Sequence, residues 1–76
     1  MAIFVNYYGD NIPYFIGEIY KYPDGDEIKL IGIDESRHRF MFEKNHWCTD
    51  LVFMDLIRVK TGIQVYKSTA RQLSIF

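Results

Sequence analysis

The sequence predicts a small all-β or β-dominated α+β fold, in a single domain that spans residues 1–76. Clusters of turn-forming residues recur at short intervals, and the segments between them are rich in β-branched and aromatic residues. No segment has apolar residues at helical spacing over the length of an ordinary helix. A hydrophobic fraction of 49% with 25% charged residues is typical of a globular chain, and 76 residues leave room for one core. We therefore expect about five to six short strands and one short helical turn.

Three strands are predicted in the first half of the chain. Residues 3–8 (IFVNYY) and 14–22 (YFIGEIYKY) are rich in strand-forming residues, and Gly17 inside the second run indicates a bend or bulge. Residues 27–33 (EIKLIGI) follow the turn sequence PDGD, in which Pro presets the first corner and Gly supplies a positive φ. These features predict a hairpin between the second and third strands.

Residues 37–43 (RHRFMFE) alternate between two faces, which is the period of a β-strand. The alternation assigns His38, Phe40 and Phe42 to the inner face of that strand and the charged residues to its outer face. Because His38 stands in line with two phenylalanines, we expect it to be a partly buried packing residue.

A second hairpin is predicted in residues 55–67 (DLIRVKTGIQVYK). A three-residue loop at residues 60–62, with Gly62 at the position of positive φ, sets Val59 opposite Ile63. In this register apolar residues face apolar ones and polar residues face polar ones. We therefore prefer it to the register of a two-residue loop, which would set apolar residues opposite polar ones.

One helical turn is predicted near residues 50–54, where Thr49 or Asp50 can serve as the N-cap. The pattern argues against a long helix through Val59, because the apolar positions between residues 51 and 59 scatter around the helical circle. The tail, residues 68–76, ends in apolar side chains that either dock on the core or meet a partner. Short strands in this number, joined by tight turns, suggest a strongly bent barrel of the SH3-like or OB-like kind, or an open twisted sheet.

Composition and charge argue against several function classes. The net charge of -1 argues against a protein that mainly binds nucleic-acid phosphates, because such domains usually carry a clear basic excess. The charge is unevenly distributed, however: most acidic residues lie in the first 35 residues and most basic residues in the rest. A single cysteine cannot form an internal disulfide, so we expect a reducing compartment and a cytoplasmic location. The sequence shows neither a signal peptide nor an apolar run of membrane-span length, so no membrane partner is predicted.

Both histidines and the only cysteine fall in residues 38–50. His46, Cys48 and Asp50 alternate and His38 could supply a fourth donor, which is a set that zinc accepts. Strong zinc signatures repeat Cys or His pairs at fixed spacing, and this chain does not. We therefore interpret the stretch as a strand followed by a turn in which Trp47 packs inward, with no metal and no cofactor.

No catalytic site is predicted either. Cys48 with a histidine base has the residue types for nucleophilic catalysis, but no nucleophile elbow, oxyanion loop or phosphate-binding glycine run can be identified. We expect a protein that is not an enzyme.

The remaining classes of function are binding functions. We expect a module that binds a protein or peptide partner, possibly a second copy of itself, because tyrosines give rigid, amphipathic contact area. The alternative is a barrel that binds single-stranded nucleic acid with basic and aromatic residues. In either case the predicted binding residues are Tyr20, Tyr22, Arg37, Arg39 and Trp47.

Overall fold

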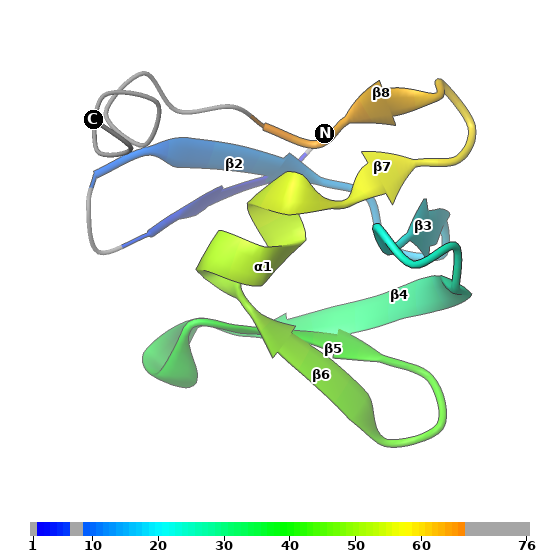
Figure 1. Cartoon of the computed structure of the whole chain (residues 1–76). Coiled ribbons are helices and arrows are strands. Elements are labelled where there is room, and N and C mark those ends of the chain that lie inside the picture. The colour runs from blue at the N-terminus through cyan, green and yellow to red at the C-terminus, as the bar shows by residue number, and fades with distance from the viewer. Residues whose placement is uncertain (1, 7–8, 67–76) are drawn as a thin grey trace.

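The computed structural model of this protein describes residues 2–6 and 9–66, which form eight short strands, one α-helix and one 3-10 turn (Figure 1). The predicted tail, residues 68–76, lies outside the described residues. In chain order the elements are β1 (Ala2–Val5), β2 (Asn11–Tyr14), β3 (Ile19–Lys21), β4 (Glu27–Asp34), η1 (Glu35–Arg37), β5 (Arg39–Phe42), β6 (His46–Thr49), α1 (Asp50–Asp55), β7 (Ile57–Arg58) and β8 (Ile63–Gln64).

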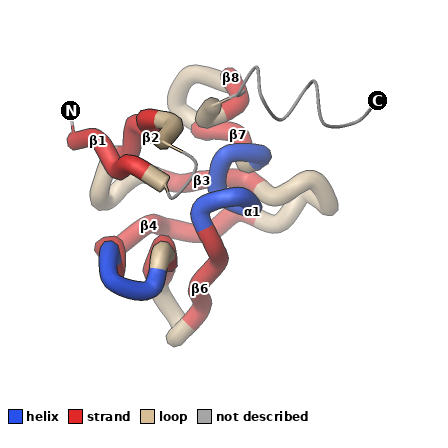
Figure 2. Tube along the Cα trace, turned by 90° about the vertical axis from the view of Figure 1, so that its left-hand side faces the viewer, coloured by secondary structure: helices blue, strands red, loops and turns tan. Residues whose placement is uncertain are grey.

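All strand pairs are antiparallel, and they form two sheets. β1 and β2 pair as a separate hairpin, and the larger sheet has the order β6-β5-β4-β3-β7-β8. Figure 1 shows the β1–β2 hairpin above and strands β4 to β6 below, with α1 at a level between them, and Figure 2 shows the same levels from the side. This order is linear, so β6 and β8 are the two ends of the sheet over the residues described.

The strand-dominated fold class with one short helix is confirmed, whereas the expected number of strands was too low. Gly17 adopts a φ of 90° and divides the predicted segment 14–22 between β2 and β3, as its assignment to a bend predicted. The segment expected to be a turn after residue 43 contains a further strand, β6, which pairs with β5. Trp47 accordingly points outward from β6 and is 43% exposed, so the prediction that it packs inward was wrong.

The hairpin formed by β3 and β4 is confirmed. Lys21 pairs with Glu27, the amide of Tyr22 donates to the carbonyl of Asp26 over 2.7 Å, and Gly25 has a φ of 102°. The PDGD sequence therefore forms the tight turn that its residue types indicate.

The hairpin formed by β7 and β8 exists, but its predicted register was wrong by one residue. Arg58, rather than Val59, lies opposite Ile63, so the loop has four residues, 59–62. Gly62 has the expected positive φ, 70°, and its amide donates to the carbonyl of Arg58 over 2.7 Å. Since β8 is exposed on both faces, its apolar pattern does not select the register, and the turn hydrogen bonds at Arg58 do.

The core lies between the β1–β2 hairpin and the larger sheet, and α1 contributes to it. Phe40 of β5 and Phe53 of α1 stack with parallel rings whose centroids are 3.8 Å apart. The inward assignment of Phe40 and Phe42 is confirmed, since both are buried. The buried hydrophobic residues are Phe4, Ile12, Tyr20, Leu30, Phe40, Phe42, Cys48, Phe53, Met54 and Leu56.

His38 does not belong to the strand in which it was predicted. It caps η1 with a φ of 55°, and β5 begins at the next residue. Its ring meets the ring of Phe4 edge-on at 5.5 Å, and its side chain is 37% exposed. The expected partial burial is confirmed, but the 3-10 turn rather than strand alternation places the side chain there.

Candidate functional site

Tyr20 lies at the centre of the sheet, where β3 pairs with both β4 and β7. Its ring packs on Phe53 at 4.8 Å, and its hydroxyl oxygen accepts the amide hydrogen of Phe15 over 3.1 Å. The residue is fully buried, and burial raises the pKa of its hydroxyl. Tyr20 therefore supports a binding surface from beneath and does not offer the exposed contact area for which it was selected.

Tyr22 is half-buried at the end of the β3–β4 hairpin. Its hydroxyl shares a hydrogen bond of 2.9 Å with Nε2 of His46, and burial raises the pKa of the hydroxyl. Beside this pair is an open hollow of about 490 Å³, whose wall includes the carboxylates of Asp24, Asp26 and Glu27. Tyr22 is thus separated from the predicted basic residues and faces an acidic surface.

Arg37 lies in η1, and Arg39 and Trp47 lie on the paired strands β5 and β6. The guanidinium of Arg39 lies over the indole of Trp47, 3.9 Å from the ring centroid, and Arg39 pairs in register with Asp34 of β4. The carboxylate of Asp34 is also 3.8 Å from the guanidinium of Arg37. The structure thus brings three of the five predicted residues together, with one acidic neighbour.

The candidate metal ligands are held apart by different contacts. His46 bonds to Tyr22, Cys48 is buried in the core, and the buried carboxylate of Asp50 lies 3.6 Å from Nδ1 of His38. Within residues 2–6 and 9–66, no three side chains of the His, Cys, Asp and Glu types could hold a metal ion together.

The thiol of Cys48 is not in an activating environment. Burial raises its pKa to about 11, the charge of Asp50 adds to the rise, and the Tyr22 hydroxyl offsets part of it. A thiol with this pKa is protonated near neutral pH, whereas a catalytic cysteine needs a depressed pKa.

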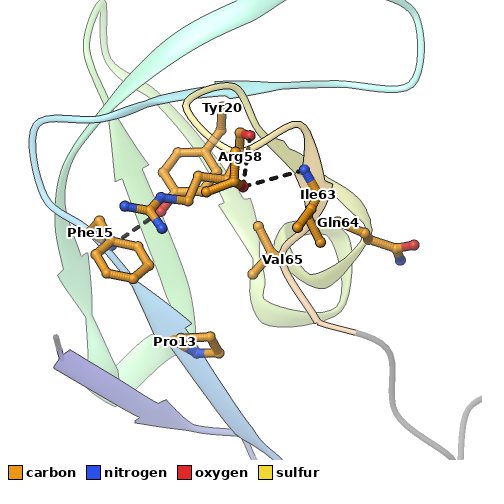
Figure 3. A pocket seen from close by; sticks show the side chains of 8 residues that line it. Pro13, Phe15, Tyr20, Arg58, Ile63, Gln64 and Val65 are labelled. Atoms are coloured by element: carbon orange, nitrogen blue, oxygen red, sulfur yellow. Dashed lines mark hydrogen bonds between the residues drawn. The ribbon is translucent and has the colours of Figure 1, made fainter.

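A pocket that the sequence did not reveal opens between the β2–β3 connection and the β7–β8 hairpin. It has a volume of about 250 Å³ and is mostly apolar (Figure 3). Its lining residues are Pro13, Phe15, Tyr20, Arg58, Thr61, Ile63, Gln64 and Val65.

One charged side chain at this pocket is fixed in place. Arg58 of β7 donates from Nε and Nη2 to the two carboxylate oxygens of Glu18, and the Nη2 bond is 2.6 Å long. Its guanidinium also lies over the ring of Phe15 (Figure 3). The guanidinium carbon is 3.6 Å from the ring centroid. The hydrogen bonds with Arg58 hold the pKa of Glu18 below its usual value, so the pair is ionised at neutral pH.

Arg58 was not among the binding residues predicted from the sequence. Its pocket partners Pro13 and Phe15 lie more than forty residues earlier in the chain, and β3 brings the two segments together by pairing with β7. The one local signal was a pair of apolar residues, Ile63 in β8 and Val65 just after it, separated by the polar Gln64.

Comparison with protein-family models, with curated proteins and with solved structures finds no match to this chain. Among the described residues, no helix has the length and the apolar character that crossing a membrane requires.

Proposed function

We propose that this protein is a non-catalytic interaction module that binds a protein or peptide partner at the pocket between the β2–β3 connection and the β7–β8 hairpin. The observation that carries the proposal is an apolar hollow with one pre-oriented guanidinium at its side. Peptide-binding domains commonly use shallow apolar hollows of this kind, with a few polar groups that fix orientation. The volume suits one or two apolar side chains better than a complete cofactor.

The surroundings of the pocket also support a macromolecular partner. Ile63 at its rim is 67% exposed, and Ile3, which pairs with Pro13 of the pocket, is 44% exposed. The apolar surface therefore continues from the pocket onto the β1–β2 hairpin. An apolar strip on one side of a small protein is typical of an interaction surface.

A selection from a random dodecapeptide library tests this function. We expect peptides enriched on the wild-type protein to shift the NMR amide signals of Phe15, Ile63 and Val65. The variant Ile63→Asp should weaken this binding at least tenfold. Val59→Asp is the matched control, because Val59 is a 40% exposed residue of the same hairpin that does not line the pocket. Enriched peptides that shift only signals elsewhere would refute the proposal.

Single-stranded nucleic-acid binding is the second candidate, and the contact between Arg39 and Trp47 favours it. An exposed indole with arginines beside it can stack a base and contact a phosphate. The test is fluorescence anisotropy of labelled random single-stranded DNA and RNA at low and near-physiological salt. This candidate predicts salt-sensitive binding that Arg37→Glu with Arg39→Glu abolishes; equal binding by wild type and variant would exclude that role for the two arginines.

Two broader expectations remain proposals. The bend at Gly17 and the antiparallel strand order support a strongly bent sheet of the SH3-like or OB-like barrel kind. The single cysteine, which is free and buried, supports a reducing, cytoplasmic location.

A further inference from the structure

The guanidinium of Arg58 donates hydrogen bonds to Glu18 from one edge only. Its donors Nε and Nη2 bond to Glu18, while Nη1 has no hydrogen-bond partner among the residues that the structure describes. An arginine carries five N–H groups in one plane, so the edge formed by Nη1 and Nη2 can still donate to both oxygens of a second carboxylate. Glu18 and the ring of Phe15 hold the group, so little side-chain entropy remains to be lost on binding.

The charge at this side of the pocket favours an acidic ligand. Glu18 neutralises Arg58, and the ammonium of Lys60 in the adjacent loop is near enough to contribute to the low pKa of Glu18. The two cations and one carboxylate leave a positive balance next to the apolar wall formed by Pro13 and Val65. A ligand that complements both features has an apolar side chain beside a negative charge.

We propose that the partner of this pocket is a peptide segment with an acidic side chain next to a large apolar one, the apolar group entering the pocket and the carboxylate binding the free edge of Arg58. This inference rests on the proposed peptide-binding function and names the ligand chemistry of the same site. The carboxylate belongs to an acidic side chain and not to a chain terminus, because an internal segment can also extend along the apolar strip.

Three octapeptides, acetylated and amidated at their ends, test the inference on the full-length ¹⁵N-labelled protein. Their central residues are Glu-Leu-Phe-Glu, Gln-Leu-Phe-Gln and Lys-Leu-Phe-Lys, each between Gly-Ser flanks. We expect the acidic peptide to shift the signals of Phe15, Ile63 and Val65, and to bind at least fivefold more tightly than the Gln peptide. The Lys peptide should bind most weakly, and added salt should reduce the differences.

The variant Arg58→Lys tests the bidentate hydrogen bonding of the guanidinium independently of its charge. Lysine keeps the positive charge but cannot donate to a carboxylate in bidentate geometry. We expect the preference for Glu over Gln to fall several-fold in this variant, whereas Lys44→Arg, at a residue of the β5–β6 turn that does not line the pocket, should leave it unchanged. The preference measured on the wild-type protein stands as a test even if Arg58→Lys does not fold.

The outcomes separate this inference from the function on which it rests. Equal binding of the Glu and Gln peptides overturns the carboxylate inference, and so does a Gln peptide with a free C-terminus that binds as tightly as the acidic one. If library-selected peptides shift the pocket signals while all three octapeptides fail to bind, the proposed function stands and the inference falls. If no selected peptide shifts those signals either, both fall.

Discussion

Arg58 and Glu18 connect two parts of the chain that are 40 residues apart in sequence. Both side chains are about one-fifth exposed, so water screens their attraction, and the bidentate geometry matters more than the charges alone. The same pair orients the guanidinium beside the pocket. At the scale of the residue, a contact that stabilises the fold also prepares the surface that we propose binds a partner.

The ionisation of Glu18 predicts how stability depends on pH. Its pKa in the folded protein lies below the ordinary value of 4.5, so the pair stabilises the fold fully above pH 4.5 and loses this contribution as the pH falls through the lowered pKa. Urea unfolding of wild type and Glu18→Gln should show a stability difference at pH 7 that shrinks as the pH falls below 4.5. Glu27→Gln, at an exposed site, is the control; a Glu18→Gln difference that does not change with pH would contradict the prediction.

The environment of Cys48 predicts slow thiol chemistry. Because its pKa is about 11 and the side chain is buried, we expect a disulfide reagent at pH 8 to react at least about 100-fold more slowly with the folded protein than with the denatured one. The double variant Cys48→Ser with Thr49→Cys moves the thiol to the adjacent exposed position and should react rapidly when folded. Equal rates for folded and denatured wild type would show that the thiol is accessible.

At the scale of the element, positive φ angles identify the turns that tolerate few replacements. Lys44 and Asn45, between β5 and β6, have φ values of 64° and 57°, and the amide of His46 closes the turn on the carbonyl of Glu43. Two consecutive positive φ values are typical of a type I′ turn, whose right-handed twist matches that of the strands it joins. Asparagine suits the second position because its short polar side chain tolerates this conformation.

The β5–β6 turn therefore gives a prediction for backbone strain. Asn45→Val should lower the free energy of unfolding by about 1–2 kcal/mol, since a β-branched residue is strained at positive φ. Asn45→Gly is the matched replacement and should retain the wild-type stability within about 0.5 kcal/mol, because glycine adopts this conformation freely. Denaturant unfolding monitored by the fluorescence of Trp47 measures both; equal stabilities of the Val and Gly variants would argue against a strained turn.

At the scale of the whole molecule, one aromatic cluster joins all the parts. Phe4 of the β1–β2 hairpin contacts Phe40 of the larger sheet edge-on at 5.1 Å, and Phe40 stacks on Phe53 of the helix. With six residues, α1 is too short to be stable alone, so its packing through Phe53 and Met54 holds it in place. The two sheets and the helix should consequently unfold together.

This shared core predicts a cooperative response to one substitution. Phe53→Leu should reduce the free energy of unfolding by about 1–3 kcal/mol, from the lost ring stacking and the void left behind, without separating the transition into steps. Val52→Ala, at a 41% exposed neighbour on the same helix, should cost less than about 0.5 kcal/mol. Circular dichroism and tryptophan fluorescence should give coincident curves; separate transitions would show that the hairpin and the sheet are independent.

The sequence by itself determined the features that depend on near neighbours. Turn residues and alternation predicted the β3–β4 hairpin, the bend at Gly17, the inward phenylalanines of β5 and the helical turn after Thr49, because each follows from conformational preferences within a few residues. The same local information placed Arg37, Arg39 and Trp47 close enough in sequence to share a surface.

Only the tertiary structure decided which of these residues are accessible and where the pocket lies. Tyr20 and Tyr22 have similar sequence surroundings, yet Tyr20 is buried because β4 and β7 flank it on both sides. The register of β8 depended on hydrogen bonds in its turn, and the pocket exists because β3 and β7 pair across nearly forty residues. Burial and long-range pairing depend on the folded chain as a whole, so local patterns could not reveal the site that Arg58 and Phe15 form together.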